Sequence, residues 1–313
     1  MKRMICGLLS ISVLFISCQT ANADQTDELI PSSHEDFTTK SASIDMIKVE
    51  GGSFRTGLTK EELETTFPQF ITNQHQDFWI DMFIPHQVTL STYFVSKYEI
   101  TQKQYFDVMN VNPTREDRFG DLFPVSQVSW FDAIDFCNAL SVLESKTPCY
   151  SIDKSQSEED QTKWVIILNI NASGYRLPTD VEWEYAAGGG NKSMSYFYSG
   201  SNDYTEVAIF NENYIGPEGQ EPRPSTVGSK KANEIGIFDM SGNLMEWIWD
   251  SPYLYSSESV KDPVGSDGVY HSRQVRGQCI YNPAQSYKMR ISSNQPETKQ
   301  NGTSFRIVCR IGS

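Results

Sequence analysis

Three segments of the chain combine a helix-capping pattern with apolar residues at helical spacing. A Ser or Thr followed three residues later by an acid or amide can bond reciprocally with the first backbone N–H groups of a helix. The apolar residues after each pattern recur at three- and four-residue intervals, which is typical of one helical face. The sequence therefore predicts helices with N-caps at Thr101, Ser129 and Thr179. The third is bracketed by Pro178 and Gly188, because proline blocks backward extension and glycine favours termination.

Short strands are predicted where apolar and polar residues alternate, at residues 92–100, 164–169 and 305–311. Residues 196–234 and 250–275 show neither period and are rich in Gly, Pro, Asn, Ser and Asp. Loops of this length in a compact domain are usually functional, or are held by ions or disulfides. We therefore expect a single α+β domain with few helices, short strands and much irregular chain.

The N-terminal end has a basic start and a short apolar run, which together are typical of an export signal. The run is too short to span a bilayer. Residues 14–18 read LFISC and resemble the bacterial lipobox, in which the small Ser17 precedes the cut and Cys18 takes the lipid. This pattern predicts a signal peptide at residues 1–17 and lipidation of Cys18. The alternative is a plain secretory signal cut near Ala23, and both interpretations predict export.

Residues 18–44 are rich in Gln, Thr, Ser, Asp and Glu and contain few apolar side chains. Such a segment cannot bury enough surface to order itself. We expect a flexible tether at residues 18–44, followed by a folded domain at residues 45–313.

Composition adds two constraints on the domain. The chain has 313 residues, of which 38% are hydrophobic and 12% aromatic, which is enough for a substantial core. Its formal net charge of −14 argues against a nucleic-acid partner.

Several motifs together carry a family resemblance. Residues 174–187 read GYRLPTDVEWEYAA, and residues 236–247 read GIFDMSGNLMEW. Residues 46–57, 93–101 and 124–133, then Arg276-Gly277 and Ser304-Phe305-Arg306, match further motifs in the same order. This series resembles the formylglycine-generating enzyme (sulfatase-modifying factor) family. The resemblance implies a variant of the C-type-lectin-like fold, with residues 46–57 as an opening hairpin.

The resemblance does not extend to the catalytic residues. Active members of the family oxidise a sulfatase cysteine with copper(I) held by two cysteines downstream of an R-G-G-S-W motif, and copper(I) prefers such soft ligands. Here no cysteine lies between Ile280 and Val308, and Met245 replaces the first Trp of the W-E-W motif. Cys279 is a single thiol upstream of the catalytic positions, so it is a weak catalytic candidate and a better structural one. We expect neither copper binding nor formylglycine generation.

A calcium site is implied by the loop of the second motif. Family members bind calcium there through the first acid or amide, two carbonyls and the Glu, which suits an ion that prefers hard oxygen ligands. The implied ligands are Asp239, the carbonyls of Gly242 and Leu244, and Glu246. The alternative is a capped turn with a solvated Glu246. A weaker second site would use Asn213 and the Tyr214 carbonyl.

Four cysteines remain once Cys6 leaves with the signal and Cys18 is lipidated: Cys137, Cys149, Cys279 and Cys309. An even number in an oxidising compartment indicates disulfides, with three possible pairings. The family resemblance implies a Cys137–Cys309 bridge and leaves the state of the other two open.

These observations lead to two functional hypotheses. The leading hypothesis is a non-catalytic binding or scaffold lipoprotein of the bacterial envelope, facing the periplasm or cell surface, with a peptide or envelope protein as ligand. The alternative is an oxidoreductase of the same family that uses other residues. Metal content distinguishes them, since a catalytic protein should bind copper or iron and a binding module at most calcium.

Overall fold

The computed structural model describes residues 35–57, 59, 61–62, 65, 85–210, 223–252, 258–265, 272–277 and 292–310. Internal contacts divide the chain into residues 1–32 and 33–313, and every described residue belongs to the second unit. The predicted signal peptide and Cys18 therefore lie outside the described residues, as do Asn213, Tyr214 and Cys279.

All three predicted helices are present. They are α3 (Gln102–Met109), α4 (Trp130–Leu143) and α5 (Asp180–Ala187), and a reciprocal capping box begins each one. The structure also has the short helix α6 (Tyr204–Val207) and the 3-10 turns η2 (Glu116–Arg118), η3 (Gln161–Lys163) and η4 (Gly190–Lys192).

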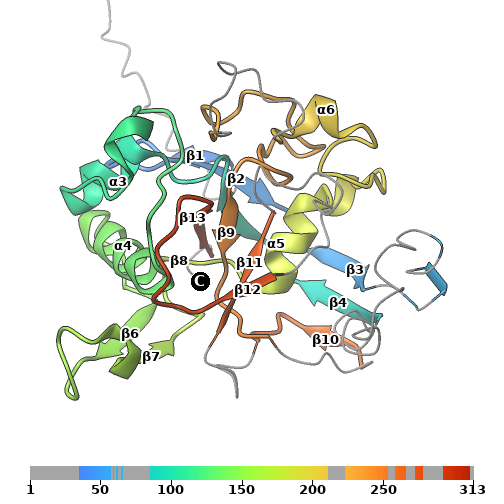
Figure 1. Cartoon of the computed structure of the whole chain (residues 1–313). Helices are drawn as coiled ribbons and strands as arrows, with labels where there is room; N and C mark the ends of the chain where they lie inside the picture. The colour runs from blue at the N-terminus through green and yellow to red at the C-terminus, as the bar shows by residue number, and fades with distance from the viewer. Residues whose placement is uncertain are drawn as a thin grey trace, which may run out of the picture. The chain divides into compact units, whose positions relative to one another are not determined.

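The described strands form four small sheets (Figure 1). The five-stranded sheet has the order β1 (Phe37–Thr38), β2 (Asp45–Val49), β5 (Tyr93–Ser96), β14 (Val308–Cys309) and β8 (Tyr175–Arg176). The three-stranded sheet has the order β10 (Val260–Lys261), β4 (His86–Leu90) and β3 (Gly52–Thr56). The four-stranded sheet has the order β12 (Ser292–Asn294), β11 (Arg273–Arg276), β9 (Met245–Trp247) and β13 (Thr303–Phe305). The last sheet pairs β6 (Tyr150–Asp153) with β7 (Val165–Leu168).

The predicted hairpin at residues 46–57 is wrong. β2 and β3 follow each other in the chain, but β2 pairs with β5 and β3 pairs with β4, so they belong to different sheets. The chain changes sheet at Gly51, where a Cβ atom would lie 2.6 Å from the Leu90 carbonyl oxygen. Close approach of two backbones at this corner thus requires glycine.

The predicted start of the domain at residue 45 is also wrong. β1 pairs with β2, and the Phe37 ring lies 5.0 Å from the Phe94 ring. Ala42 and Ile44 are buried in the main core cluster. Because these few apolar side chains pack on an existing sheet, residues 35–44 are ordered despite their polar composition.

Two clusters of buried hydrophobic side chains lie on either side of the chain around β9. Side chains of α4 pack in the larger cluster with Trp247, whereas α5 packs in the second cluster with Ile248. Since successive strand residues point to opposite faces, the chain around β9 contributes to both clusters. Within the described ranges, no helix combines the length and apolar content needed to cross a bilayer.

Candidate functional site

The loop that carries the predicted calcium ligands has an unusual backbone. Asp239, Gly242 and Asn243 have φ angles of 59°, 84° and 57°. A Cβ atom at Gly242 would lie 2.7 Å from the Ile209 carbonyl oxygen, so only glycine fits there. Hydrogen bonds from these residues to distant segments hold the positive φ angles in place, as is usual for strained loops at functional sites.

Glu99 is the first of these anchors, and it is completely buried. One of its carboxylate oxygens accepts a 2.6 Å bond from Nδ2 of Asn243, and the other accepts a 3.0 Å bond from the backbone N–H of Leu244. The chain just after β5 and the loop are thereby joined through one buried side chain.

Glu246 and Arg306 form the centre of the site. The Glu246 carboxylate accepts two bonds of 2.6 Å from Nε and Nη2 of Arg306, and both side chains are fully buried. Nε1 of Trp183 donates a further 2.7 Å bond to the same carboxylate. Arg306 also donates to the carbonyl oxygens of Ser96 and Phe238, each at 3.0 Å. Such a two-bond geometry is the strongest form of ion pair available to arginine.

Carboxyl groups outnumber cations around this centre. Glu99, Asp239 and Glu246 interact electrostatically with the single guanidinium of Arg306. Burial raises the pKa of Glu99 well above its usual range, and the neighbouring carboxylates add to the effect. Burial also raises the pKa of Asp239 to about 6, although the Gly228 N–H opposes this change. Part of the negative charge is therefore removed by protonation near neutral pH.

The predicted calcium ligands are only partly brought together. Asp239, Gly242, Leu244 and Glu246 lie in one loop, but both Glu246 oxygens face Arg306. No group of three or more His, Cys, Asp or Glu side chains is arranged to hold a metal among the residues that the structure describes. This geometry does not fit a calcium ion bound directly by Glu246, because an arginine already neutralises that carboxylate. Calcium binding elsewhere in the loop stays a prediction.

Three carboxylates of helix α5 pair with two further arginines, which the sequence patterns did not reveal. Asp180 and Glu184 bind Arg276, with contacts of 2.5 and 3.0 Å. Glu182 binds Arg176 through two bonds of 2.6 Å, and it still accepts from the Thr179 N–H as the capping pattern predicts. The signal in the sequence was an arginine with apolar neighbours, as in Tyr-Arg-Leu at residues 175–177, since a buried arginine requires a carboxylate partner.

Asp250 lies against the start of α5. Its carboxylate accepts a 2.7 Å bond from the backbone N–H of Asp180. A Cβ atom on Gly265 would overlap the other carboxylate oxygen, so the chain passes over Asp250 at a glycine. Burial, followed by repulsion from Asp180, raises the pKa of Asp250 to about 8.

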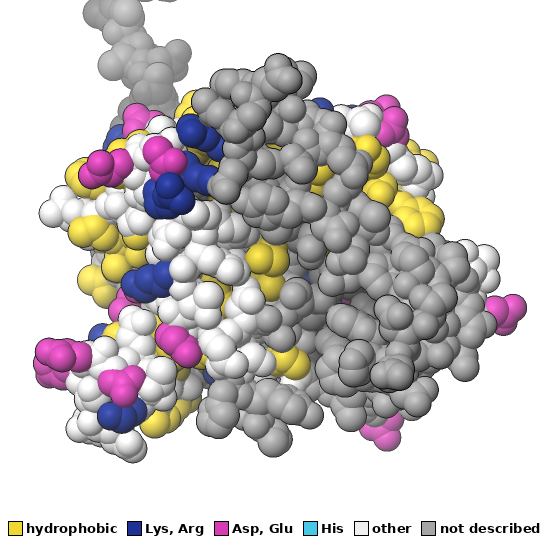
Figure 2. Space-filling view, in the orientation of Figure 1, with side chains coloured by type: hydrophobic (Ala, Val, Ile, Leu, Met, Phe, Trp, Pro, Cys, Tyr) yellow, Lys and Arg dark blue, Asp and Glu magenta, His cyan; other side chains and the backbone are white. Residues whose placement is uncertain are grey.

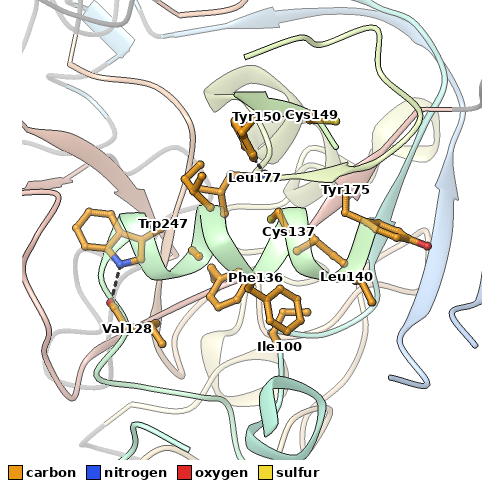
Figure 3. Close-up of a cluster of buried hydrophobic side chains, with 14 of the residues drawn as sticks. Ile100, Val128, Phe136, Cys137, Leu140, Cys149, Tyr150, Tyr175, Leu177 and Trp247 are labelled. Atoms are coloured by element: carbon orange, nitrogen blue, oxygen red, sulfur yellow. Dashed lines mark hydrogen bonds between the residues drawn. The ribbon is translucent and has the colours of Figure 1, made fainter. Parts of the chain in front are cut away.

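The predicted Cys137–Cys309 disulfide is not formed in the structure. Cys137, Cys149 and Cys309 are all buried free thiols. Cys137 lies on α4 within the apolar cluster around Phe136 and Leu140 (Figure 3). Burial raises the pKa of Cys137 well above its usual range and that of Cys309 to about 12. The apolar surroundings thus favour neutral thiols, which are poor nucleophiles and poor metal ligands.

Comparison with known proteins defines the class of this domain. Residues 33–311 match the model of the sulfatase-modifying factor enzyme 1-like domain family. The structure of Treponema denticola variable protein 1 superimposes with a TM-score of 0.70 and 25% identity, over 88% of this chain and 98% of that chain. The chain belongs to the sulfatase-modifying factor family, and its fold is the α+β fold of that family.

Relatives of the chain have different functions. The chaperone protein LppX of Paenibacillus barcinonensis is 40% identical over 66% of this chain and 72% of its own length. The formylglycine-generating enzyme of Streptomyces coelicolor is 31% identical over 44% of this chain and 47% of that protein. The inactive Cα-formylglycine-generating enzyme 2 of Mus musculus is 25% identical over 44% of each chain. The chain therefore spans less than half the length of the two enzyme-type relatives.

Removing Arg306 should strongly destabilise the domain. Arg306→Met leaves Glu246 buried without its cation, which typically costs about 3–5 kcal/mol. Arg115→Met is the matched control, because Arg115 is exposed and its ion pair with Asp117 is worth about 1 kcal/mol or less. Urea unfolding monitored by tryptophan fluorescence measures the loss in the free energy of unfolding for each variant. Equal losses in the two variants would show that the Glu246 pair is not the dominant contact.

Asp250 should make the domain less stable as pH rises. Its folded pKa of about 8 lies above the ordinary 3.8, so the folded state retains a proton that the unfolded chain releases between those values. Asp250 should by itself lower the free energy of unfolding across this range by a few kcal/mol, at a rate of at most about 1.4 kcal/mol per pH unit. Asp250→Asn should make the profile less steep, leaving the contributions of Glu99 and Asp239, whose pKa values are also raised. Asp153→Asn, at an exposed site, should leave the profile unchanged above pH ~4. An Asp250→Asn profile as steep as the wild type would contradict the assignment.

Proposed function

We propose that this protein is a non-catalytic binding module of the bacterial envelope, exported and anchored through a lipid on Cys18, which holds extended or partly folded polypeptides. Its domain keeps the sulfatase-modifying factor fold without the cysteine pair on which copper-dependent oxidation relies. Calcium, if bound, has a structural role in this proposal, and copper has none.

One observation carries the proposal. The chain has no cysteine between Ile280 and Val308, where the family's catalytic pair would lie. The thiols that the structure describes do not replace it, since Cys137, Cys149 and Cys309 are buried with raised pKa values. Without accessible thiolates, these cysteines cannot hold copper(I) in a reactive geometry.

The relatives support a binding role in different degrees. LppX, which is named a chaperone protein, matches at higher identity and over more of its length than the formylglycine-generating enzymes. The mouse relative is itself described as inactive. A scaffold that has lost the metal ligands can retain a binding surface, because surface shape depends on the fold and not on the metal.

The first test separates binding from catalysis. The protein, supplied with copper(I), should not convert a Cys-x-Pro-x-Arg peptide to formylglycine, because both catalytic thiols are missing. It should slow the aggregation of a reduced, denatured model polypeptide, measured by light scattering against an unrelated acidic protein. Mass spectrometry of the peptide gives the first result. Formylglycine that appears with wild type and disappears with Cys279→Ser would make the protein an enzyme and overturn the proposal.

The second test concerns the anchor. A clickable fatty-acid analogue fed to expressing cells should label the wild type and not Cys18→Ala, because the lipobox-like residues end at Cys18. Cys6→Ala is the matched control, since Cys6 lies within the predicted signal peptide and its loss should leave labelling intact. An unlabelled wild type whose mature N-terminus maps beyond Cys18 would remove the anchor from the proposal and leave export in place.

A further inference from the structure

The β6–β7 hairpin is separate from the other sheets. β6 (Tyr150–Asp153) and β7 (Val165–Leu168) pair only with each other among the described strands. The hairpin lies beside α4, at the lower left of Figure 1. A two-stranded sheet has two open edges, and an open edge presents unpaired backbone groups to any neighbouring chain.

The register shows which backbone groups face the open edge. Asn138 bonds both the N–H and the C=O of Tyr150, at 3.2 and 2.9 Å, so these groups point away from β7. Tyr150 lies opposite Leu168, and bonded and non-bonded pairs alternate along an antiparallel ladder. Leu168 and Ile166 are therefore in non-bonded positions, and their N–H and C=O groups point outward from β7. The structure shows no partner for these groups among the described residues.

The side chains of β7 make this edge apolar. Ile166 and Leu168 pack against the main core cluster, whereas Val165 and Ile167 are 50% and 65% exposed. Soluble proteins usually protect an edge strand with a charge, a proline or a bulge within it. The sequence Val-Ile-Ile-Leu contains none of these.

We propose that β7 is a docking edge to which an extended segment of a client polypeptide adds as a third strand. The outward groups of Ile166 and Leu168 bond its backbone, and Val165 and Ile167 contact its apolar side chains. Main-chain bonding of this kind gives affinity with little sequence specificity, because every residue carries the same backbone groups. The inference rests on the proposed binding function and assigns it a surface.

The charge of the neighbouring turn indicates which segments fit. Lys154 lies over the Trp164 ring at 3.7 Å, and Lys163 pairs with Asp160 at 3.1 Å. The turn and its flanks also carry further acidic residues: Asp153, Glu158 and Glu159. Acidic side chains are visible on this part of the surface in Figure 2. A client strand with Lys or Arg beside its apolar residues is thus favoured, whereas a second copy would bring the same acidic turn and a net charge of −14.

A designed peptide tests the edge directly. The probe is a short peptide of alternating Val and Thr with Lys at one end, and its control has alternate backbone amides N-methylated, which prevents strand pairing. Ile167→Lys should weaken binding of the probe about tenfold or more, because a like charge replaces an apolar contact at the edge. Val142→Lys is the matched control on α4, since Val142 is 64% exposed and lies outside the hairpin. It should bind as the wild type does.

Amide exchange followed by NMR gives a second, independent readout. The amides of Ile166 and Leu168 should exchange rapidly in the free protein and slow at least severalfold with the probe, while those of Val165 and Ile167 should be protected throughout. If Ile167→Lys and Val142→Lys bound the probe equally, and the amides of Ile166 and Leu168 stayed unprotected, β7 would not be the docking edge. That result would leave the proposed function standing. If the wild type bound no polypeptide at all, the proposed function itself would be overturned. Self-association that disappears in Ile167→Lys would identify a second copy as the occupant and also overturn the inference.

Discussion

A buried guanidinium must have a carboxylate partner, and this requirement organises the domain. Arg176, Arg276 and Arg306 are each no more than 1% exposed. Two of them pair with carboxylates of α5, and the third pairs with Glu246, which Trp183 of α5 also bonds. A helix of eight residues thereby connects β8, β11 and the chain after β13. Removing one member of such a pair leaves an uncompensated charge in the interior, so the contacts depend on one another.

This arrangement explains how strands of two to five residues can support a domain with so much irregular chain. Short strands form few backbone hydrogen bonds with their neighbours. Hydrogen bonds from side chains to the backbone of loops provide part of the missing stabilisation. Glu99 and Asp239 bond the backbone at Leu244 and Gly228, and Asp250 bonds the start of α5. The arginine–carboxylate network contains no thiol. Loss of the family's catalytic cysteines therefore leaves the network's bonds intact.

Local patterns predicted local structure well. Each of the three capping patterns lies at the start of a helix, because a capping box depends only on residues within one turn. Pairings between distant segments were not predictable in this way. The supposed hairpin at residues 46–57 failed because partner choice depends on β4 and β5, and the tether boundary failed because Phe37 packs on Phe94. The role of Glu246 was missed for the same reason, since Arg306 lies sixty residues further along the chain.

The three buried thiols have a consequence for the order of events during biogenesis. In an extended chain each cysteine is exposed and titrates near its ordinary pKa, so an oxidising compartment can act on it. Once α4 docks, Cys137 is fully buried and Cys309 is nearly so. If the chain is exported as proposed, folding competes with oxidation there, because the native packing buries the thiols. The burial of these thiols therefore depends on folding, and with it their accessibility to any oxidant.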